Sequence, residues 1–270
     1  MPVRVADPSG FSGKWASVAV GDFFVCGIDS DGAGYCWGRG DLGMLGNGGD
    51  KDKDSPVAVA SPSGFSGSWK RIVAGQSRAC GVDSSGARFC WGAGNTASLP
   101  DDFSPVGVPA PANGTWQAIH VGTHFQCGLV SDGTILCWGD DWIGSVGNGP
   151  DGEFVAAPAP IDSTVKFQQI GLDGESYHVC AVSLSNDVYC WGRNSNGQTG
   201  VPPATTTVHS PLKLTGHALS RVAVGEFVSC GVDLVGAALC WGQGKNGELG
   251  DGLLTTSSIP VKVADPQPAP

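Results

Sequence analysis

The cysteines of this chain occur in five pairs, and the two members of each pair are always ten residues apart. The pairs recur about every 50 residues, and each second cysteine begins the tripeptide Cys-Trp-Gly, as in Cys36-Trp37-Gly38. A repeat of this length with glycine and tryptophan landmarks is typical of a propeller or a solenoid. The ten cysteines are Cys26, Cys36, Cys80, Cys90, Cys127, Cys137, Cys180, Cys190, Cys230 and Cys240.

Each repeat contains short stretches in which apolar and polar residues alternate, bounded by Gly, Pro and Asp, and no stretch keeps a helical period. Such alternation predicts β-strands. We expect four strands in each repeat. The first is a Pro-Val segment such as Pro56–Val59, the second begins at an apolar residue such as Trp69, and the third and fourth carry the two cysteines.

A turn residue lies six positions after each first cysteine, at Gly32, Gly86, Gly133, Asn186 and Gly236. A short hairpin loop needs a positive φ there, which Gly takes freely and Asn tolerates. This turn places the paired cysteines opposite each other on adjacent antiparallel strands. A zinc site would need close Cys-x-x-Cys pairs and additional histidine ligands, and the sequence has neither. We therefore predict one disulfide in each repeat, in a chain that folds in an oxidising compartment.

The charge and the hydropathy of the chain argue against two classes of partner, nucleic acid and the membrane interior. The formal net charge is −10 and basic residues are not clustered, which disfavours binding to nucleic acid. No apolar run approaches the length of about 20 residues that a membrane helix needs, so we expect no membrane insertion. The start, Met1–Val5, has no apolar signal-peptide core, so we expect any secretion signal to have been removed or to lie outside this chain.

Several motifs together resemble the repeats of the regulator of chromosome condensation superfamily of β-propellers. They are Gly-x-x-x-x-Cys-Gly, an Asp-Gly turn, Cys-Trp-Gly, and a loop such as Gly43–Gly48, Gly144–Gly149 or Gly247–Gly252. The fourth repeat keeps only Gly197–Gly200 of this loop, and the second loses it at residues 95–98. The paired cysteines are similar to those of the extracellular subset of this family, which includes the ectodomains of crinkly-type plant receptor kinases. The resemblance implies a propeller that binds proteins.

We therefore predict an all-β propeller of about five four-stranded blades, with one disulfide in each blade. The expected organisation is a single domain over residues 1–263 and a Pro-rich tail or linker over residues 264–270. The five tryptophans of the Cys-Trp-Gly tripeptides are expected to pack between blades. The expected repeats are residues 1–54, 55–103, 104–156, 157–209 and 210–258, followed by a duplicated first strand at 259–263.

The sequence predicts no enzyme, metal site or cofactor. Gly38–Gly43 and Gly242–Gly247 satisfy Gly-x-Gly-x-x-Gly, but no helical pattern follows, as a dinucleotide site requires. No nucleophile–base, paired-carboxylate or metal-ligand set recurs. We expect a non-enzymatic extracellular module that binds proteins or has a structural role. The alternative is a glycan-binding or glycan-acting propeller that uses the acids Asp22, Glu175 and Glu226.

Three loop features are candidate contacts. Arg39-Gly40-Asp41 is a tripeptide that integrins read on exposed turns, although it arises easily by chance in a Gly-rich loop. Trp142 follows two acidic residues and is expected either to pack on a neighbouring loop or to contact a sugar or a partner protein. Asn113-Gly114-Thr115 is a glycosylation sequon, with Asn113 as the acceptor. His124 and His178 precede first cysteines and are expected at a solvated channel mouth.

The two ends of the chain carry nearly the same strand. Pro2–Pro8, with Val3 and Val5, reappears as Pro260–Pro266, with Val261 and Val263. One copy is therefore spare in a five-bladed ring. It is expected to fray, to start a further blade, or to pair with a neighbouring molecule, in which case head-to-tail strand donation would build an extracellular filament.

Overall fold

The structure is a computed structural model that describes residues 3–11, 13–93, 102–149, 152, 154–172 and 174–264. All regular elements in this part of the chain are strands, except for the short 3-10 helix η1 (Asp41–Gly43). No helix in these ranges is long and apolar enough to cross a membrane. The chain forms two compact units, Met1–Thr123 and His124–Pro270.

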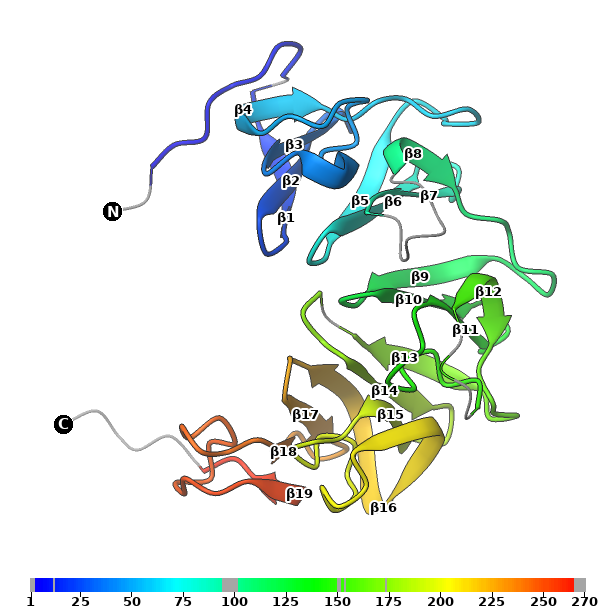
Figure 1. The fold of residues 1–270 in the computed structure, drawn as a ribbon, viewed down its shortest axis with the longest axis vertical. Coiled ribbons are helices and arrows are strands. Elements are labelled where there is room, and N and C mark those ends of the chain that lie inside the picture. Colours follow the sequence, from blue (N-terminus) through cyan, green and yellow to red (C-terminus); the bar gives the residue numbers. More distant parts are fainter. Residues whose placement is uncertain are drawn as a thin grey trace. The chain divides into compact units, whose positions relative to one another are not determined.

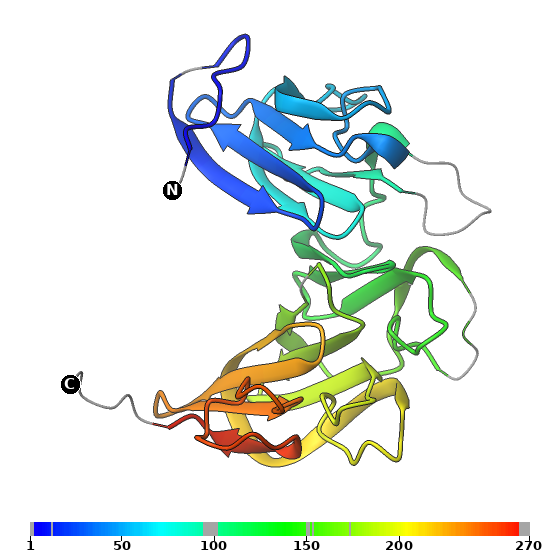
Figure 2. The same ribbon diagram turned by 60° about the vertical axis from the view of Figure 1, so that its left-hand side comes forward.

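The first unit contains two four-stranded antiparallel sheets, each with its strands in sequence order (Figure 1). Figure 2 shows the first strands of blade one side by side in blue. Blade one consists of β1 (Trp15–Val20), β2 (Phe24–Asp29), β3 (Gly34–Gly38) and β4 (Lys53–Ala58). Blade two consists of β5 (Trp69–Ala74), β6 (Arg78–Asp83), β7 (Arg88–Gly92) and β8 (Asp102–Gly107), and β9 (Trp116–Val121) is the last strand of this unit.

The second unit continues the same pattern with one difference. Its strands are β10 (Phe125–Val130), β11 (Ile135–Gly139), β12 (Val155–Pro160), β13 (Phe167–Gly171), β14 (His178–Ser183), β15 (Asp187–Arg193), β16 (Thr207–Val224), β17 (Val228–Asp233), β18 (Ala238–Gly242) and β19 (Ser257–Lys262). Strand β16 has 18 residues: its first half pairs with β15 in blade four and its second half with β17 in blade five. The two blades therefore form one seven-stranded sheet. Between blades one and two, the corresponding connection contains Pro62, Gly64 and Gly67, which interrupt the strand.

The predicted hairpins and disulfides are present in all five repeats. The paired cysteines are directly opposite in register, as in Cys26↔Cys36 and Cys180↔Cys190, with Cα–Cα distances of 4.0–4.1 Å. The turn residues have positive φ, including Asn186 at 65°. The all-β fold of four-stranded blades, each with its own disulfide, is confirmed.

The Pro-Val strand lies at the opposite edge of the sheet from the one we expected. It pairs with the strand that carries the second cysteine, as in Cys36↔Val57 and Cys240↔Val261, and so ends a blade instead of beginning one. The Pro-Val strand follows the cysteine hairpin in the chain, and the strand of the second cysteine is the free edge of that hairpin that it reaches first. Its backbone therefore pairs there. Residues 259–262 are therefore not a spare strand. The outer boundaries of the repeats and of the domain stay predictions, and most of the tail lies outside the described residues.

The tryptophans of the Cys-Trp-Gly tripeptides explain why the loops that follow them contain glycine: the loop of one blade packs against the indole of the next blade. In three blades the indole Nε1–H donates to a loop carbonyl of the preceding blade: Trp91 to Met44 (3.1 Å), Trp191 to Ser145 (3.0 Å) and Trp241 to Gln198 (2.9 Å). These three side chains are fully buried and Trp138 is 7 % exposed, whereas Trp37 of blade one is half-buried. The next glycine of the loop lies against the indole, because a Cβ at Gly147 would come within 2.6 Å of Trp191 Nε1.

This contact gives a test of the packing between blade three, to which β10–β12 belong, and blade four, which begins at β13. We expect Gly147→Ala to lower the free energy of unfolding by about 3 kcal/mol, through the clash with Trp191 and a φ of +72° that disfavours a side chain. Gly149→Ala is the control, because Gly149 also has a positive φ but no atom within 4 Å of the added Cβ; it is expected to cost about 1 kcal/mol. Urea unfolding of both variants measures the difference. Equal losses would show that the indole contact contributes nothing.

Candidate functional site: an aromatic rim on the second unit

The same backbone hydrogen bond closes one end of the hairpin in every blade. The residue three after the second cysteine donates its N–H to the carbonyl of the residue three before the first, at 2.9–3.0 Å. Side chains at these two positions are therefore brought together in each blade. In the second unit the two positions hold His124 with Asp140, Tyr177 with Arg193, and Phe227 with Gln243.

Four side chains at these positions and the nearby Trp142 form a set that we call the aromatic rim: His124, Trp142, Tyr177, Arg193 and Phe227. The Arg193 Cζ lies 5.5 Å from the Tyr177 ring centroid and 5.1 Å from that of Phe227, and Nε of Arg193 donates to Ser195 Oγ at 3.1 Å. Trp142 meets Tyr177 edge-on at 6.4 Å, and His124 lies 6.2 Å from Tyr177. The cation between two rings is fixed by cation–π attraction of about 0.5–1 kcal/mol for each ring at such half-exposed sites.

The rim is a surface and not a core cluster. Trp142 is 61 % exposed, and the other four rim residues are half-buried. Asp140 lies next to His124, and burial raises the pKa of its carboxyl, while the charge of His124 opposes that shift. Tryptophan, tyrosine and arginine are the residues that most often dominate the binding energy of protein interfaces. The arrangement can therefore bind another molecule through stacking.

The two acids before Trp142 have different roles. Asp141 is buried, and its Oδ1 accepts the Val146 N–H at 2.8 Å, which holds the loop that Trp191 covers. Asn194 does the same in blade four, where its Oδ1 accepts the Thr199 N–H at 3.0 Å. Burial raises the pKa of Asp141. Asp141 is thus a structural residue, while Trp142 projects from the loop it fixes.

The Arg39-Gly40-Asp41 loop is closed on itself. Arg39 Nη2 donates to Asp41 Oδ2 at 2.5 Å, and the Arg39 Cζ lies 5.2 Å above the Phe23 ring. Gly40 is buried and donates its N–H to Asp52 Oδ1. The two charged groups that an adhesion receptor would read are therefore paired with each other.

The other predicted residues are dispersed. Asn113 is exposed in a turn, as glycosylation requires. Glu175 and Glu226 are exposed and lie two residues before Tyr177 and one residue before Phe227, whereas Asp22 belongs to the first unit. In the described ranges, no group of three or more His, Cys, Asp or Glu side chains could hold a metal ion.

The four strand-donation valines have different environments. Val3 is 90 % exposed, and residues 3–8 form no strand, so Val5 is also outside the sheet. Val261 lies in β19, and Val263 follows it and donates its N–H to the Ala238 carbonyl. The C-terminal copy therefore occupies the last position of blade five.

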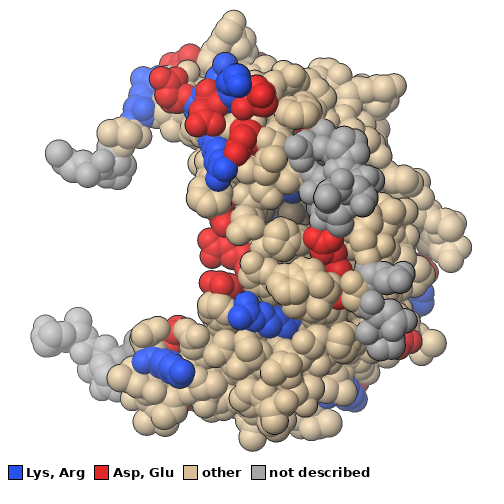
Figure 3. Space-filling view, viewed as in Figure 1, with Lys and Arg blue, Asp and Glu red and all other residues tan. Residues whose placement is uncertain are grey.

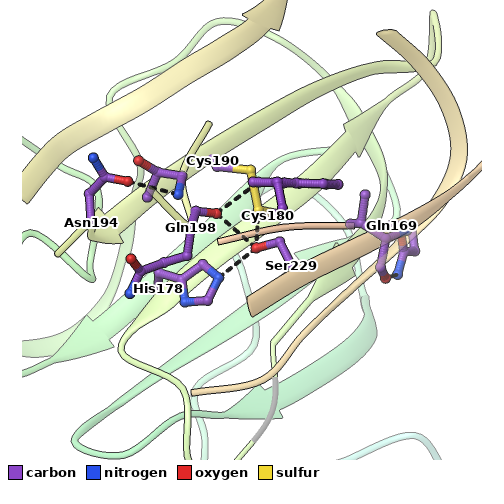
Figure 4. The surroundings of a disulfide bond; sticks show 10 residues. Gln169, His178, Cys180, Cys190, Asn194, Gln198 and Ser229 are labelled. Carbon is purple, nitrogen blue, oxygen red and sulfur yellow. Dashed lines mark hydrogen bonds between the residues drawn. A yellow bond between two sulfur atoms is a disulfide. The ribbon is translucent and has the colours of Figure 1, made fainter. Parts of the chain in front are cut away.

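His178 is not at a solvated channel mouth, contrary to the expectation from its sequence position. It is completely buried beside the Cys180–Cys190 disulfide (Figure 4), and its Nε2 lies 2.7 Å from Ser229 Oγ. Ser229 Oγ donates to the Gln198 carbonyl at 2.8 Å, so Nε2 is the protonated nitrogen that donates to Ser229. Burial lowers the pKa of His178 to about 3. A serine and a histidine in contact with no access to solvent form a structural bridge between blades four and five.

The sequence alone points to Trp142 and His124 but not to the other three rim residues. Tyr177, Arg193 and Phe227 show no signal in any one repeat, because each is an ordinary hairpin residue there. Aligning the five repeats on their cysteines places Tyr177 and Phe227 at the position of Phe23 and His124, and Arg193 at the position of Arg39.

Comparisons with known proteins identify the repeat. Residues 31–87 and 175–198 match the family described as the regulator of chromosome condensation (RCC1) repeat. Human and mouse E3 ubiquitin-protein ligase HERC2 are each 32 % identical to this chain over 96 residues, which make up 34 % of this chain and 2 % of those proteins. The chain therefore spans a small fraction of the length of the curated relatives it matches.

Solved structures show the same fold. Human WBSCR16 has a TM-score of 0.76 at 18 % identity, with 93 % of this chain and 67 % of that chain covered. Yeast RCC1 (Prp20), solved bound to Kap60, has a TM-score of 0.57 at 19 % identity, with 94 % and 76 % covered. The ectodomain of the Physcomitrella patens receptor kinase CR4 has a TM-score of 0.52 at 24 % identity, with 85 % and 52 % covered. At these identities the likeness establishes the fold alone.

Proposed function

From the premise that this chain is built from regulator of chromosome condensation (RCC1) repeats, we propose that it is a non-enzymatic protein-binding module of the extracellular space. The observation that carries the proposal is the aromatic rim. An exposed tryptophan beside a tyrosine and a fixed arginine provides the side chains that dominate protein interfaces. Yeast RCC1 (Prp20), which shares the fold, is solved in complex with Kap60, and its binding to Gsp1p and histones has been described.

The proposed compartment follows from the cysteines. All ten are paired, and such a set persists only under oxidising conditions. The fold is shared with a receptor-kinase ectodomain. In each unit, the coloured part of the face drawn in Figure 3 is mostly uncharged, and its Lys and Arg side chains lie in small separate groups. A partner that binds by stacking and shape fits this surface better than a polyanion.

The test is capture of extracellular proteins from the source material on immobilised chain, with Trp142→Ala as the variant. We expect proteins retained by the wild type to be lost with Trp142→Ala, because truncating an anchoring tryptophan costs about 2 kcal/mol or more in binding. Thermal unfolding should stay unchanged, because the side chain is exposed. Leu184→Ala is the matched control: Leu184 is 65 % exposed in the same unit, beyond the opposite end of β14.

The glycan alternative is tested with the same Trp142→Ala variant and with Glu226→Gln. If glycans on an array bind the wild type and are lost with Trp142→Ala, the rim is a sugar-stacking surface instead. Hydrolysis that disappears with Glu226→Gln would make the module an enzyme. Retention of the same proteins by wild type and Trp142→Ala would contradict the rim as the binding surface.

A second candidate function is assembly of this chain with itself, as the subunit of an extracellular filament. In blade one, Val18 is 62 % exposed and Val20 is 72 % exposed. Their counterparts in the other blades are buried or partly buried, and those of Val18 are Ile72, Ile119, Ile170 and Val222, at 7, 5, 3 and 4 % exposure. Blade one thus leaves open a face that the other blades cover. Because β19 fills the edge of blade five in the same chain, strand donation would require Val3 and Val5 of one molecule to displace Val261 and Val263 of another from that edge.

Self-assembly is tested by deleting residues 1–7. Deleting β19 instead would remove a strand of blade five, so the N-terminal copy is the informative segment. We expect the intact chain to form larger species in sizing chromatography and electron microscopy and the shortened chain to lose them. A monomeric intact chain at high concentration, or assemblies that persist after the deletion, would exclude strand donation.

A further inference from the structure

Blade two contains a buried arginine at a position where the other blades have uncharged residues. Arg88 begins β7 and is 6 % exposed. In the other blades, the residue at this register position is Gly34, Ile135, Val188 or Ala238. The pattern of the repeat therefore does not require a charge here.

The guanidinium of Arg88 is only partly satisfied. Its Nη2 donates to the Trp116 carbonyl at 2.6 Å and its Nη1 to the Gly86 carbonyl at 3.2 Å, while its buried Nε has no hydrogen-bond partner among the described residues. No described carboxylate forms an ion pair with it. The nearby Asp83 accepts instead from the donors of Ser66, Ser85 and Ala87.

Burying a cation without an ion-pair partner has a free-energy cost, which lowers the pKa of the group. Burial lowers the pKa of Arg88, and the charge of the exposed Arg71 lowers it further, while Asp83 opposes the shift. Two guanidinium groups thus act on the same place in a chain whose net charge is −10. An anion bound beside the guanidinium would relieve this repulsion.

Arg88 lines a groove of about 300 Å³ within the first unit. Apolar and small residues form the rest of its lining, including Phe89, Val108, Pro111 and Trp116. The Trp116 indole is already bonded to the Pro109 carbonyl at 3.1 Å, so its ring contributes an apolar wall.

In the first two blades, a phenylalanine packs on the tryptophan that begins the first strand, and the groove lies beside the tryptophan at the equivalent position, Trp116. Phe11 covers Trp15 at 4.7 Å and Phe65 covers Trp69 at 4.6 Å. The corresponding residue before Trp116 is Ala112. Trp116 therefore lacks the phenyl group that the equivalent tryptophans have.

We propose that this groove binds an acidic side chain of a partner polypeptide, with the carboxylate on Arg88 and an adjacent apolar residue against Trp116. Charge complementarity selects a carboxylate, and the planar guanidinium suits it because the two groups share a two-pronged geometry. The groove has an open side and glycines in its lining, such as Gly64 and Gly107, which let a peptide backbone approach. The inference depends on the proposed function only in taking a polypeptide as the ligand, since it concerns a different unit from the aromatic rim.

The test is an NMR titration of the isotope-labelled full chain with the capped peptide acetyl-Ala-Leu-Glu-Leu-Ala-amide. We expect saturable shifts of the Trp116 indole N–H and the Gly86 amide, with a dissociation constant of about 1 mM. The matching Gln peptide should bind at least about tenfold more weakly. Arg88→Val should show the same loss for the Glu peptide, and Val188 shows that valine fits this position in blade four. Arg221→Gln is the control for the loss of one positive charge, and it should leave binding of the Glu peptide unchanged. Arg221 has the register position in blade five that Arg71 has in blade two, but it lies in the second unit and does not line the groove.

Three results would overturn the proposal: equal binding of the Glu and Gln peptides, unchanged binding by Arg88→Val, or no shift up to about 20 mM peptide. If Arg88→Val does not fold, the comparison of the two peptides on the wild-type chain decides alone. A failed titration together with intact capture through Trp142 would refute this groove and leave the proposed function standing.

Discussion

Reduction of the five disulfides is expected to unfold the chain at neutral pH. Each disulfide joins cysteines ten residues apart, and closing a loop of that length in the unfolded chain contributes about 3 kcal/mol in the chain-entropy model. Five such contributions are comparable to the whole free energy of unfolding of a typical domain, about 5–15 kcal/mol. Far-UV circular dichroism during titration with dithiothreitol, with thiols counted in parallel, measures the loss of structure.

Paired substitutions test whether the effect comes from the bonds themselves. Cys180 and Cys190 are completely buried, whereas Cys230 is half-buried and Cys240 is 6 % exposed. Replacing the first pair by alanine should therefore cost more than replacing the second, because a cavity in the core adds to the lost crosslink. A reduced chain that unfolds at the same urea concentration as the oxidised chain would refute the prediction.

His178 is expected to make the protein markedly less stable in mild acid. Its pKa is about 3 in the folded chain and about 6.5 when unfolded, so the unfolded state binds the extra proton between these values. The stabilisation is complete above pH 6.5 and declines as the pH falls toward 3. At about pH 4.5 the loss is about 3 kcal/mol relative to neutral pH. Urea unfolding at the two pH values measures it.

The chain itself provides the control substitution. Phe24 and Phe125 occupy the position of His178 in blades one and three, and each is 2 % exposed. His178→Phe should therefore fold. Between neutral pH and about pH 4.5, its free energy of unfolding should fall by about 3 kcal/mol less than that of the wild type. Asp132 and Glu248, whose pKa values are lowered to about 2 by hydrogen bonds, lose their charge at lower pH in both proteins. Parallel pH profiles for the two proteins would show that His178 is not the group responsible.

The amino-acid sequence determined the parts of this structure that depend on local geometry. A cysteine, a turn residue with positive φ and a second cysteine lie within eleven residues, so the hairpin and its disulfide follow from a single turn. The same locality explains why the alternation of apolar residues was enough to predict strands. The resemblance to RCC1 repeats depended on these local motifs as well.

The tertiary structure decided everything that depends on residues from different blades. The Pro-Val strand could pair at either edge of a sheet, and only the position of the preceding hairpin selects one. His178 and Ser229 are 51 residues apart in the chain, and Arg88 and Trp116 are 28 apart, so their burial depends on how successive blades pack. The rim around Trp142 arises for the same reason, because stacking residues are brought together from adjacent repeats. Contacts of this kind leave no pattern within one repeat, whereas a hairpin does, since its own turn fixes it.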